Sequence, residues 1–181
     1  RWLEKDDSSA TKAWVKAQNK ATFGYLEQIP YREKIRKRME ELWNYPRFGA
    51  PFKEGSHYFF FKNDGLQNQA VLHIMDGLDA EPRIFLDPNK FSEDGTASLS
   101  TFEVSHDGKY AAYGISKGGS DWNEFFVRDV ETGEQLSDHL KWIKFSNVGW
   151  LKDGFFYGRF AEPTDGSALS SQNEDKKIYF H

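Results

Sequence analysis

Cysteine is absent from the 181 residues of this chain, which excludes a disulfide framework, a thiolate nucleophile and a cysteine-based metal site. Long apolar runs are missing too, and none approaches the roughly 18 residues that a membrane helix needs. The formal charge is only −4, which gives no general attraction to nucleic acid or to an anionic membrane. We therefore expect no nucleic-acid partner, no membrane partner, no metal and no other cofactor.

Aromatic residues are abundant by contrast. They make up 17% of the chain, with 16 Phe, 8 Tyr and 6 Trp, which is far more than a disordered acidic chain contains. A packed core is therefore expected. The composition does not choose between a cytoplasmic and a periplasmic location.

The first 46 residues have a helical period and differ in charge from the rest. Residues 1–48 carry a net charge of +4, whereas residues 49–181 carry −8. Apolar residues recur every three or four positions, which predicts helices over residues 8–26 and 31–43. Ser8 or Ser9 is a plausible N-cap, Pro30 suits a first helical turn, and Pro46 ends the second helix.

After Pro46 the hydrophobic period changes to two, which predicts an all-β region. Turn dipeptides separate the short apolar runs. The candidate strands are His57–Lys62, Ala70–Met75, Arg83–Leu86, Leu99–Ser105, Tyr110–Ser116, Glu124–Val130, Phe155–Phe160 and Lys176–Phe180. The turns between or beside them are Asp64-Gly65, Asp76-Gly77, Asp94-Gly95, Asp107-Gly108, Thr132-Gly133, Asp153-Gly154 and Asp165-Gly166.

This second region also repeats. The segment from Val104 to Tyr113 is similar to the segment from Trp150 to Tyr157, and a weaker copy begins at Glu54. Repeats of about 40 to 50 residues with several short strands are typical of β-propeller blades, although a β-sandwich has similar strands without a repeat. Residues 47–181 supply two to three blades, which is too few to close a propeller. We therefore expect the chain to be part of a larger folding unit.

The pattern Gly-x-Ser-x-Gly around Ser116 matches the nucleophile motif of serine hydrolases. That motif needs a strand before the serine and a helix after it. Here a glycine-rich turn and another strand follow, so a hairpin is the better interpretation and Ser116 is not predicted to be catalytic.

The histidines and basic residues show no site of their own. His57 and His73 lie in predicted strands, His106 precedes a turn, His139 lies in a predicted polar loop and His181 ends the chain. No pair has metal-ligand spacing. The basic cluster of the second helix alternates with glutamates, which indicates a solvated helix face rather than a nucleic-acid patch.

A set of ordered motifs closely resembles the N-terminal part of the prolyl oligopeptidase family, also called prolyl endopeptidases, which are serine peptidases that cleave after proline. The resemblance runs from one end of the chain to the other. It is carried by Arg1-Trp2-Leu3-Glu4, Thr11-Lys12-Ala13, Ala17-Gln18-Asn19-Lys20, Glu41-Leu42-Trp43-Asn44-Tyr45-Pro46, Asn63-Asp64-Gly65-Leu66-Gln67-Asn68-Gln69, Phe85-Leu86-Asp87-Pro88-Asn89, Gly119-Ser120-Asp121-Trp122 and Val148-Gly149-Trp150.

The resemblance implies a two-domain enzyme in which a seven-bladed propeller covers an α/β-hydrolase domain. Residues 1–46 would be a helical arm that packs on the hydrolase domain, and residues 47–181 would be the first blades of an incomplete propeller. The family's catalytic Ser, Asp and His lie in the C-terminal portion, so no catalytic residue is assigned to this chain, and the chain alone is expected to be inactive. Short proline-containing peptides and the missing hydrolase domain are the implied partners.

Two residues match positions with roles in the family. Phe145 matches a propeller phenylalanine that lines the pocket for the substrate residue two before the scissile proline; the alternative is an ordinary core strand residue. Asp121 matches an acidic residue that faces the catalytic domain and tunes a substrate-binding arginine there; the alternative is a turn former, since aspartate after Gly-Gly-Ser suits a turn.

A different class of protein fits the same composition. A stand-alone, propeller-like module could use its aromatic-rich surface to bind a peptide or protein without catalysis. For the peptidase fragment, in contrast, the helices over residues 8–26 and 31–43 would have apolar faces meant for the missing domain, which predicts that the isolated chain is poorly soluble or oligomeric.

Overall fold

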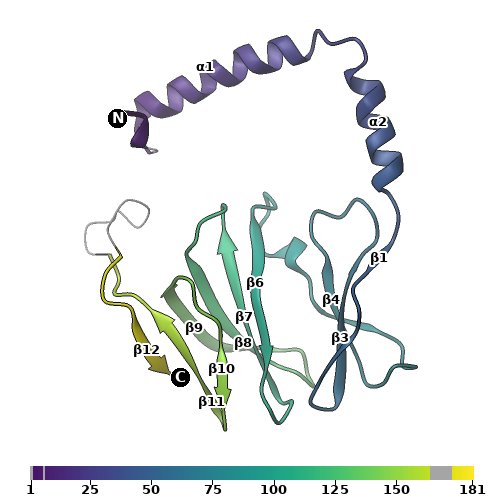
Figure 1. Ribbon diagram of the computed structural model, residues 1–181, viewed down its shortest axis with the longest axis vertical. Helices are drawn as coiled ribbons and strands as arrows, with labels where there is room; N and C mark the ends of the chain where they lie inside the picture. The colour runs from purple at the N-terminus through teal and green to yellow at the C-terminus, as the bar shows by residue number, and fades with distance from the viewer. Residues whose placement is uncertain (1, 6, 164–172) are drawn as a thin grey trace. The chain divides into compact units, whose positions relative to one another are not determined.

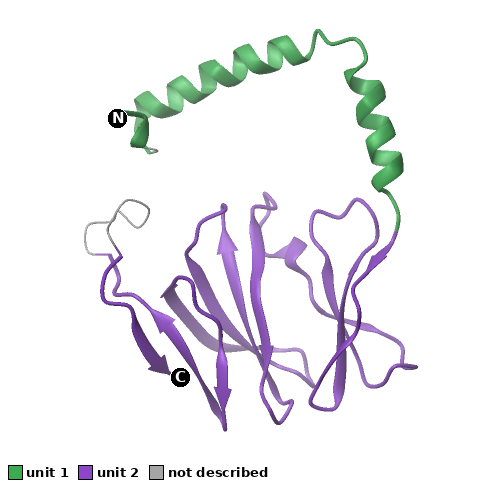
Figure 2. Cartoon of the chain, in the orientation of Figure 1, with its two compact units in different colours: residues 1–45 green, residues 46–181 purple. Residues whose placement is uncertain are grey.

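The computed structural model describes residues 2–5, 7–163 and 173–181, so the predicted turn Asp165-Gly166 lies outside the described residues. The chain divides into two compact units, residues 1–45 and residues 46–181 (Figure 2). None of the helices among the described residues has the length and apolar character needed to span a membrane.

The first unit is helical. It contains a short 3-10 helix, Trp2–Glu4, and the helices α1, Ser9–Leu26, and α2, Arg32–Trp43, which confirms both predicted helices. Ser8 is the N-cap of α1, because its hydroxyl accepts a hydrogen bond from the Thr11 backbone N–H at 3.1 Å. The prediction that Pro30 lies in the first turn of α2 is wrong. A turn from Ile29 to Arg32 precedes the helix, and Tyr31 is its N-cap.

The second unit is a set of short antiparallel strands (Figure 1). All eight predicted strands are present within two residues of their expected ends. The strands are β1 Arg47–Phe48, β2 Phe52–Glu54, β3 His57–Asn63, β4 Val71–Met75, β5 Arg83–Leu86, β6 Ala97–Val104, β7 Tyr110–Lys117, β8 Asn123–Asp129, β9 Gln135–Ile143, β10 Gly149–Leu151, β11 Gly154–Arg159 and β12 Lys177–Phe180, with a 3-10 helix at Pro88–Lys90.

Hydrogen bonding groups these strands into two antiparallel sheets, β1 to β5 and β6 to β12. We call the first sheet blade 1 and divide the second into blades 2 and 3. Blade 1 contains β2 to β5, with β1 added beside β3. Blade 2 is the four-stranded meander β6 to β9. Blade 3 contains β10 to β12, and one pair of residues, Arg159 and Ile143, connects it to blade 2. Each copy of the sequence repeat lies at the turn between the first and second strands of its blade.

The two buried clusters distinguish a propeller from a sandwich. One cluster lies between blades 1 and 2 and contains Phe59, Phe85 and Tyr113, and the other lies between blades 2 and 3 and contains Phe125 and Phe155. Blade 2 therefore has a core on each of its faces, whereas each sheet of a sandwich has one solvated face. Along β7, Ala111 and Tyr113 belong to the first cluster and Ala112 to the second. The prediction of a mainly β, partial propeller preceded by helices is confirmed.

Blades 1 and 2 are also connected by a charged side chain. Arg128 on β8 donates a hydrogen bond to the backbone oxygen of Phe85 on β5 at 2.6 Å. Its guanidinium lies 5.8 Å from the Phe85 ring centroid and 5.9 Å from that of Tyr113. A planar cation that stacks on rings from both blades fixes their separation.

Four strands were not predicted: β1, β2, β9 and β10. β9 is the longest of them, and most of its side chains are exposed or half-buried, so it has little apolar alternation. The placement of His139 in a polar loop is therefore wrong. His139 lies on β9, where its ring stacks on Phe126 at 4.7 Å and its Nε2 lies 2.7 Å from a Glu124 carboxylate oxygen. Burial raises the pKa of Glu124, but hydrogen bonds from His139 and Lys117 outweigh it and lower that pKa overall.

The predicted turns are present in the described residues, but not all for the expected reason. Gly65, Gly95, Gly108 and Gly133 have positive φ as predicted. In the turn at Asp153-Gly154, the residue with positive φ is Lys152, at 55°, and not the glycine. Gly154 is instead required for space, because a Cβ there would lie 2.3 Å from the backbone oxygen of His181.

Candidate functional site

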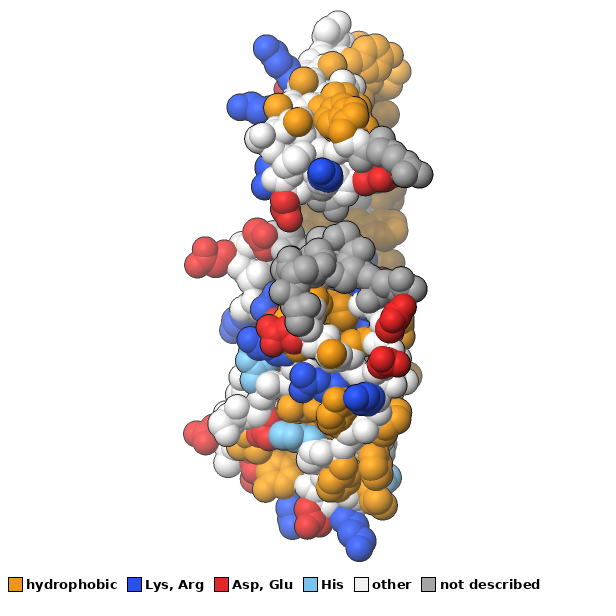
Figure 3. Space-filling view, turned by 90° about the vertical axis from the view of Figure 1, so that its left-hand side faces the viewer, with side chains coloured by type: hydrophobic (Ala, Val, Ile, Leu, Met, Phe, Trp, Pro, Cys, Tyr) orange, Lys and Arg blue, Asp and Glu red, His pale blue; other side chains and the backbone are white. Residues whose placement is uncertain are grey.

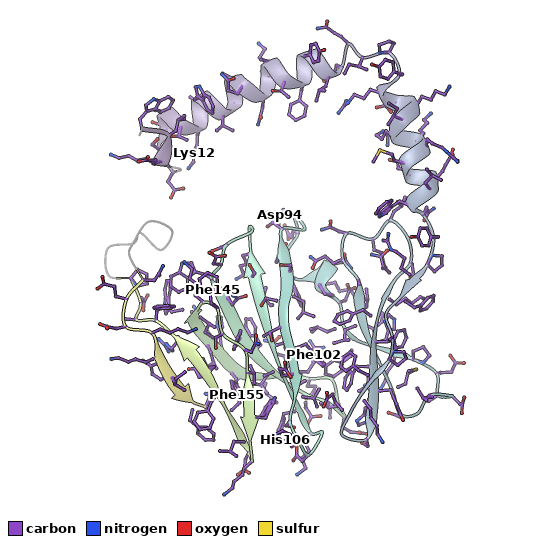
Figure 4. The ribbon with its side chains drawn as sticks, viewed as in Figure 1. Lys12, Asp94, Phe102, His106, Phe145 and Phe155 are labelled. Atoms are coloured by element: carbon purple, nitrogen blue, oxygen red, sulfur yellow. The ribbon has the colours of Figure 1, made fainter. Side chains whose placement is uncertain are left out.

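A loop after β9 carries Phe145 in a constrained backbone conformation. Its φ is +50°, in the left-handed region, which is unusual for a bulky residue. The side chain is 73% exposed, and it lies toward the end of the blades opposite His106 (Figure 4). The alternative interpretation of Phe145 as an ordinary core strand residue is therefore wrong.

Asp121 lies in the turn between β7 and β8, but its carboxylate does not form that turn. The hydroxyl of Ser120 accepts a hydrogen bond from the Trp122 backbone N–H at 3.1 Å, and the hydroxyl of Ser116 donates to the Ser120 oxygen at 2.6 Å. The backbone oxygen of Asp121 accepts from the Asn123 amide at 2.9 Å. Within the described part of the chain, no hydrogen bond or ion pair involves the carboxylate of Asp121, and it is exposed. The turn thus leaves the charged group available.

Phe145 and Asp121 line one cavity of about 460 Å³, although they are 24 positions apart in the sequence. The hairpin turn of blade 2 brings Asp121 to this cavity, and the loop from blade 2 to blade 3 brings Phe145. The other lining residues are small and polar: Ser100, Thr101, Ser116, Ser120, Asn123, Ser146 and Asn147. The side-chain oxygen of Asn123 is buried and has no hydrogen-bond partner in the described part of the chain.

The chemistry of this cavity is that of binding. Among the described residues that line it, Asp121 carries the single formal charge and Phe145 the single aromatic ring, and the remaining side chains offer hydroxyl and amide groups. Ser116 lies in a hairpin between β7 and β8, paired with Asn123, so the rejection of a nucleophile elbow is confirmed. None of the described residues that line the cavity is a histidine that could activate that hydroxyl.

The remaining histidines form no metal centre in the part of the chain that the structure describes, because no group of three His, Asp or Glu side chains there could hold an ion. His57 lies on β3 with its Nε2 3.4 Å from Asp76, and His73 lies on β4 against Phe60. The Nε2–H of His106 donates a hydrogen bond to the backbone oxygen of Trp150, 3.1 Å away, and so connects blades 2 and 3.

Sequence reasoning missed most of the cavity wall. Ser100, Asn123 and Asn147 come from three different elements, and nothing in their local sequence indicates that they lie together. The sequence also gave no indication that Phe145 and Trp142, with φ at 63°, have positive φ, because neither residue is a glycine or an asparagine. Phe145 and Asp121 were identified by their match to family positions, whereas the Gly-Gly-Ser turn before Asp121 indicated only a turn.

Comparison with known proteins places the chain in a family. The family described as "Prolyl oligopeptidase, N-terminal beta-propeller domain" matches residues 1–181. The chain belongs to this family.

Individual relatives agree. A prolyl endopeptidase from Elizabethkingia miricola is 48% identical over the whole of this chain, which covers 26% of that protein. Prolyl oligopeptidase A from Amanita bisporigera is 37% identical over 99% of this chain and 27% of its own length. The solved structure of prolyl oligopeptidase B from Galerina marginata, bound to a 35-residue hydrolysis and macrocyclization substrate, has a TM-score of 0.84 and 30% identity over all of this chain and 28% of its own. The chain thus spans about a quarter of the length of these relatives.

Proposed function

We propose that this chain forms the N-terminal helices and first propeller blades of a serine endopeptidase that hydrolyses short peptides after proline. The observation that supports this function most directly is the shared cavity of Phe145 and Asp121. The first matches a family position that lines a substrate pocket, and the second matches one that faces the catalytic domain. Family membership and relatives named as prolyl endopeptidases give the reaction class. By itself the chain is inactive in this proposal.

The two residues have different tasks. The exposed ring of Phe145 buries apolar surface of the substrate residue two before the scissile proline and so orients the peptide. Asp121 supplies a negative charge at the face toward the catalytic domain, where it tunes the arginine that binds the substrate. Both tasks improve the position of the peptide and leave the bond-breaking groups to another domain.

The proposed partner of this chain is a C-terminal α/β-hydrolase domain that holds the Ser, His and Asp. Residues 1–46 would pack on that domain, and residues 47–181 would begin the propeller that admits only short peptides. The reaction would be acyl transfer, in which His activates Ser and water later releases the acyl group. A cytoplasmic or a periplasmic enzyme would suit this proposal equally.

A hybrid enzyme, made from this chain and the rest of a relative, tests the proposal. The N-terminal portion of the Elizabethkingia miricola prolyl endopeptidase that this chain matches would be replaced by the 181 residues. The hybrid should hydrolyse a Gly-Pro reporter substrate, and the isolated chain should not. Turnover by the isolated chain that survives Ser116→Ala would contradict the proposal, and a chain that binds peptide but supports no turnover in the hybrid would favour the stand-alone binding module.

Phe145→Ala in the hybrid tests the substrate role. For a substrate with an apolar residue two positions before proline, the variant's kcat/KM should fall about tenfold. The fall should come mainly from a higher KM, because an apolar contact with the substrate is lost. With glycine at that position of the substrate, the variant should match its parent. An equal loss on both substrates would mean that Phe145 supports the fold and does not contact the peptide.

A further inference from the structure

We infer that Ser146 and Lys176 are positioning residues that hold the backbone around Phe145, so that its ring faces the substrate in a fixed orientation. This inference rests on the proposed substrate role of Phe145. It assigns roles to two residues to which the sequence analysis gave none. We call residues 144–147 the Phe145 loop.

The backbone of the Phe145 loop is fixed by blade 3 at two consecutive residues. Lys176, just before β12, donates a hydrogen bond from its Nζ to the backbone oxygen of Phe145 at 2.5 Å. The hydroxyl of Ser146 accepts a hydrogen bond from the Gly158 backbone N–H on β11 at 2.7 Å and donates to the Asn147 oxygen at 3.0 Å. The Lys176 contact involves a charged donor, which strengthens it relative to a neutral pair.

Blade 2 fixes the other side of the same loop. The Lys144 ammonium lies 4.5 Å from the centroid of the Trp122 ring, within the range of a cation–π contact. Trp122 packs edge-on against Trp142 at 5.6 Å and Phe160 at 6.0 Å, so this ring is itself well supported. Because Trp122 follows Asp121 directly, the Lys144 contact also connects the two walls of the cavity.

The ring of Phe145 has no such contacts. It is 73% exposed, and no aromatic pair among the described residues includes it. A non-glycine residue with φ near +50° is strained by about 1 kcal/mol or more, so it persists only where its surroundings hold it. A held backbone with an uncovered ring is the arrangement expected of a preorganised binding group, because less freedom is lost when a ligand binds.

Two single variants in the hybrid enzyme test this inference. Ser146→Ala removes the acceptor for Gly158, and Lys176→Met removes the donor to Phe145 while keeping the length of the side chain. The preference is the ratio of kcat/KM for a substrate with an apolar residue two positions before proline to kcat/KM for a substrate with glycine there. Each variant should reduce this ratio about fivefold, which is the effect of one lost hydrogen bond. Lys177→Met is the matched control, since Lys177 is exposed and makes no side-chain hydrogen bond or ion pair to the described residues. It should leave the preference unchanged.

Combination with Phe145→Ala separates positioning from a direct contact. If Ser146 and Lys176 act through the ring, each second substitution should add no further loss of preference in the Phe145→Ala background. Ser146→Thr and Lys176→Arg, which keep the acceptor and the donor, should restore most of the preference. Unchanged preference in both single variants, or fully additive losses, would overturn the inference. A Phe145→Ala variant that keeps its preference would instead overturn the proposed role of Phe145 itself.

Discussion

Gly55 and Gly108 are single residues that decide how closely two blades approach. Gly55 lies in the turn of blade 1 with φ at +59°, and Gly108 lies in the equivalent turn of blade 2 with φ at +75°. A Cβ on Gly55 would lie 2.7 Å from the Gly108 Cα, which is backbone and cannot rotate away. The two repeat copies therefore meet where neither can carry a side chain.

Gly55→Ala should lower the free energy of unfolding of the second unit by about 3 kcal/mol, because both the positive φ and the close approach oppose a side chain. The measurement is urea unfolding followed by tryptophan fluorescence. Gly77→Ala is the control, since Gly77 also follows an acidic residue but has no positive φ and, among the described residues, no atom within 4 Å of its Cβ position. Equal midpoints for the two variants would contradict the importance of this contact.

Turns are the elements that hold the strands in register, and several depend on an ionised aspartate. The Asp129 carboxylate accepts hydrogen bonds from the Thr132 backbone N–H at 2.8 Å and hydroxyl at 3.0 Å. The hydrogen bond from the Thr132 backbone is the main reason that the pKa of Asp129 lies below its ordinary value. Asp94 and Asp107 have lowered pKa values for the same kind of reason, through Thr96 and through Ser105 and Lys109.

A lowered pKa in the folded state makes the unfolded chain bind more protons in acid. The stabilisation by Asp129 is therefore complete above the unfolded pKa and is lost as pH falls through the folded pKa. Asp129→Asn should flatten the acid limb of the urea midpoint plotted against pH, because asparagine can still accept the turn hydrogen bond but does not titrate. Asp79→Asn is the control, since Asp79 makes no hydrogen bond to the described residues. An acid limb as steep as that of the parent chain would show that the Asp129 turn does not contribute.

On the scale of the whole molecule, the two outermost faces of the second unit are apolar. Phe156, Ile178 and Phe180 on blade 3 are 43%, 72% and 58% exposed, and Figure 3 shows hydrophobic side chains gathered on this side of the unit. Phe48 and Ile84 on blade 1 are 64% and 59% exposed. Neighbouring blades within this unit pack against one another through apolar faces. The two exposed faces are apolar in the same way, so each suits the packing of another blade.

The isolated chain should therefore self-associate, with blade 3 of one copy against blade 1 of the next. Such head-to-tail contact does not close a dimer and should give a range of sizes that grows with concentration. Ile178→Lys should reduce the mean mass measured by sedimentation, whereas Leu66→Lys, at an exposed loop position, should not. A monodisperse monomer that melts cooperatively would contradict this prediction.

The sequence by itself determined the class of fold, the helices and most strands. Apolar periods of 3.6 and 2 select which face of an element is buried, and Asp-Gly turns determine where strands end, so both signals are local. The repeat that begins at Val104 and Trp150 indicated blades because each copy forms the same turn. β9 was missed since a strand at the edge of a blade needs little apolar surface.

Only the tertiary structure decided that Phe145 and Asp121 line the same cavity, and that Lys176 reaches the Phe145 backbone from 31 positions away. It also showed that Phe145 has a left-handed backbone and an exposed ring, where the sequence allowed a core strand residue. These features depend on contacts between blades, and such contacts form between residues that are distant in the chain. Local propensity cannot encode them, because the conformation of Phe145 is imposed by its neighbours and opposes its own preference.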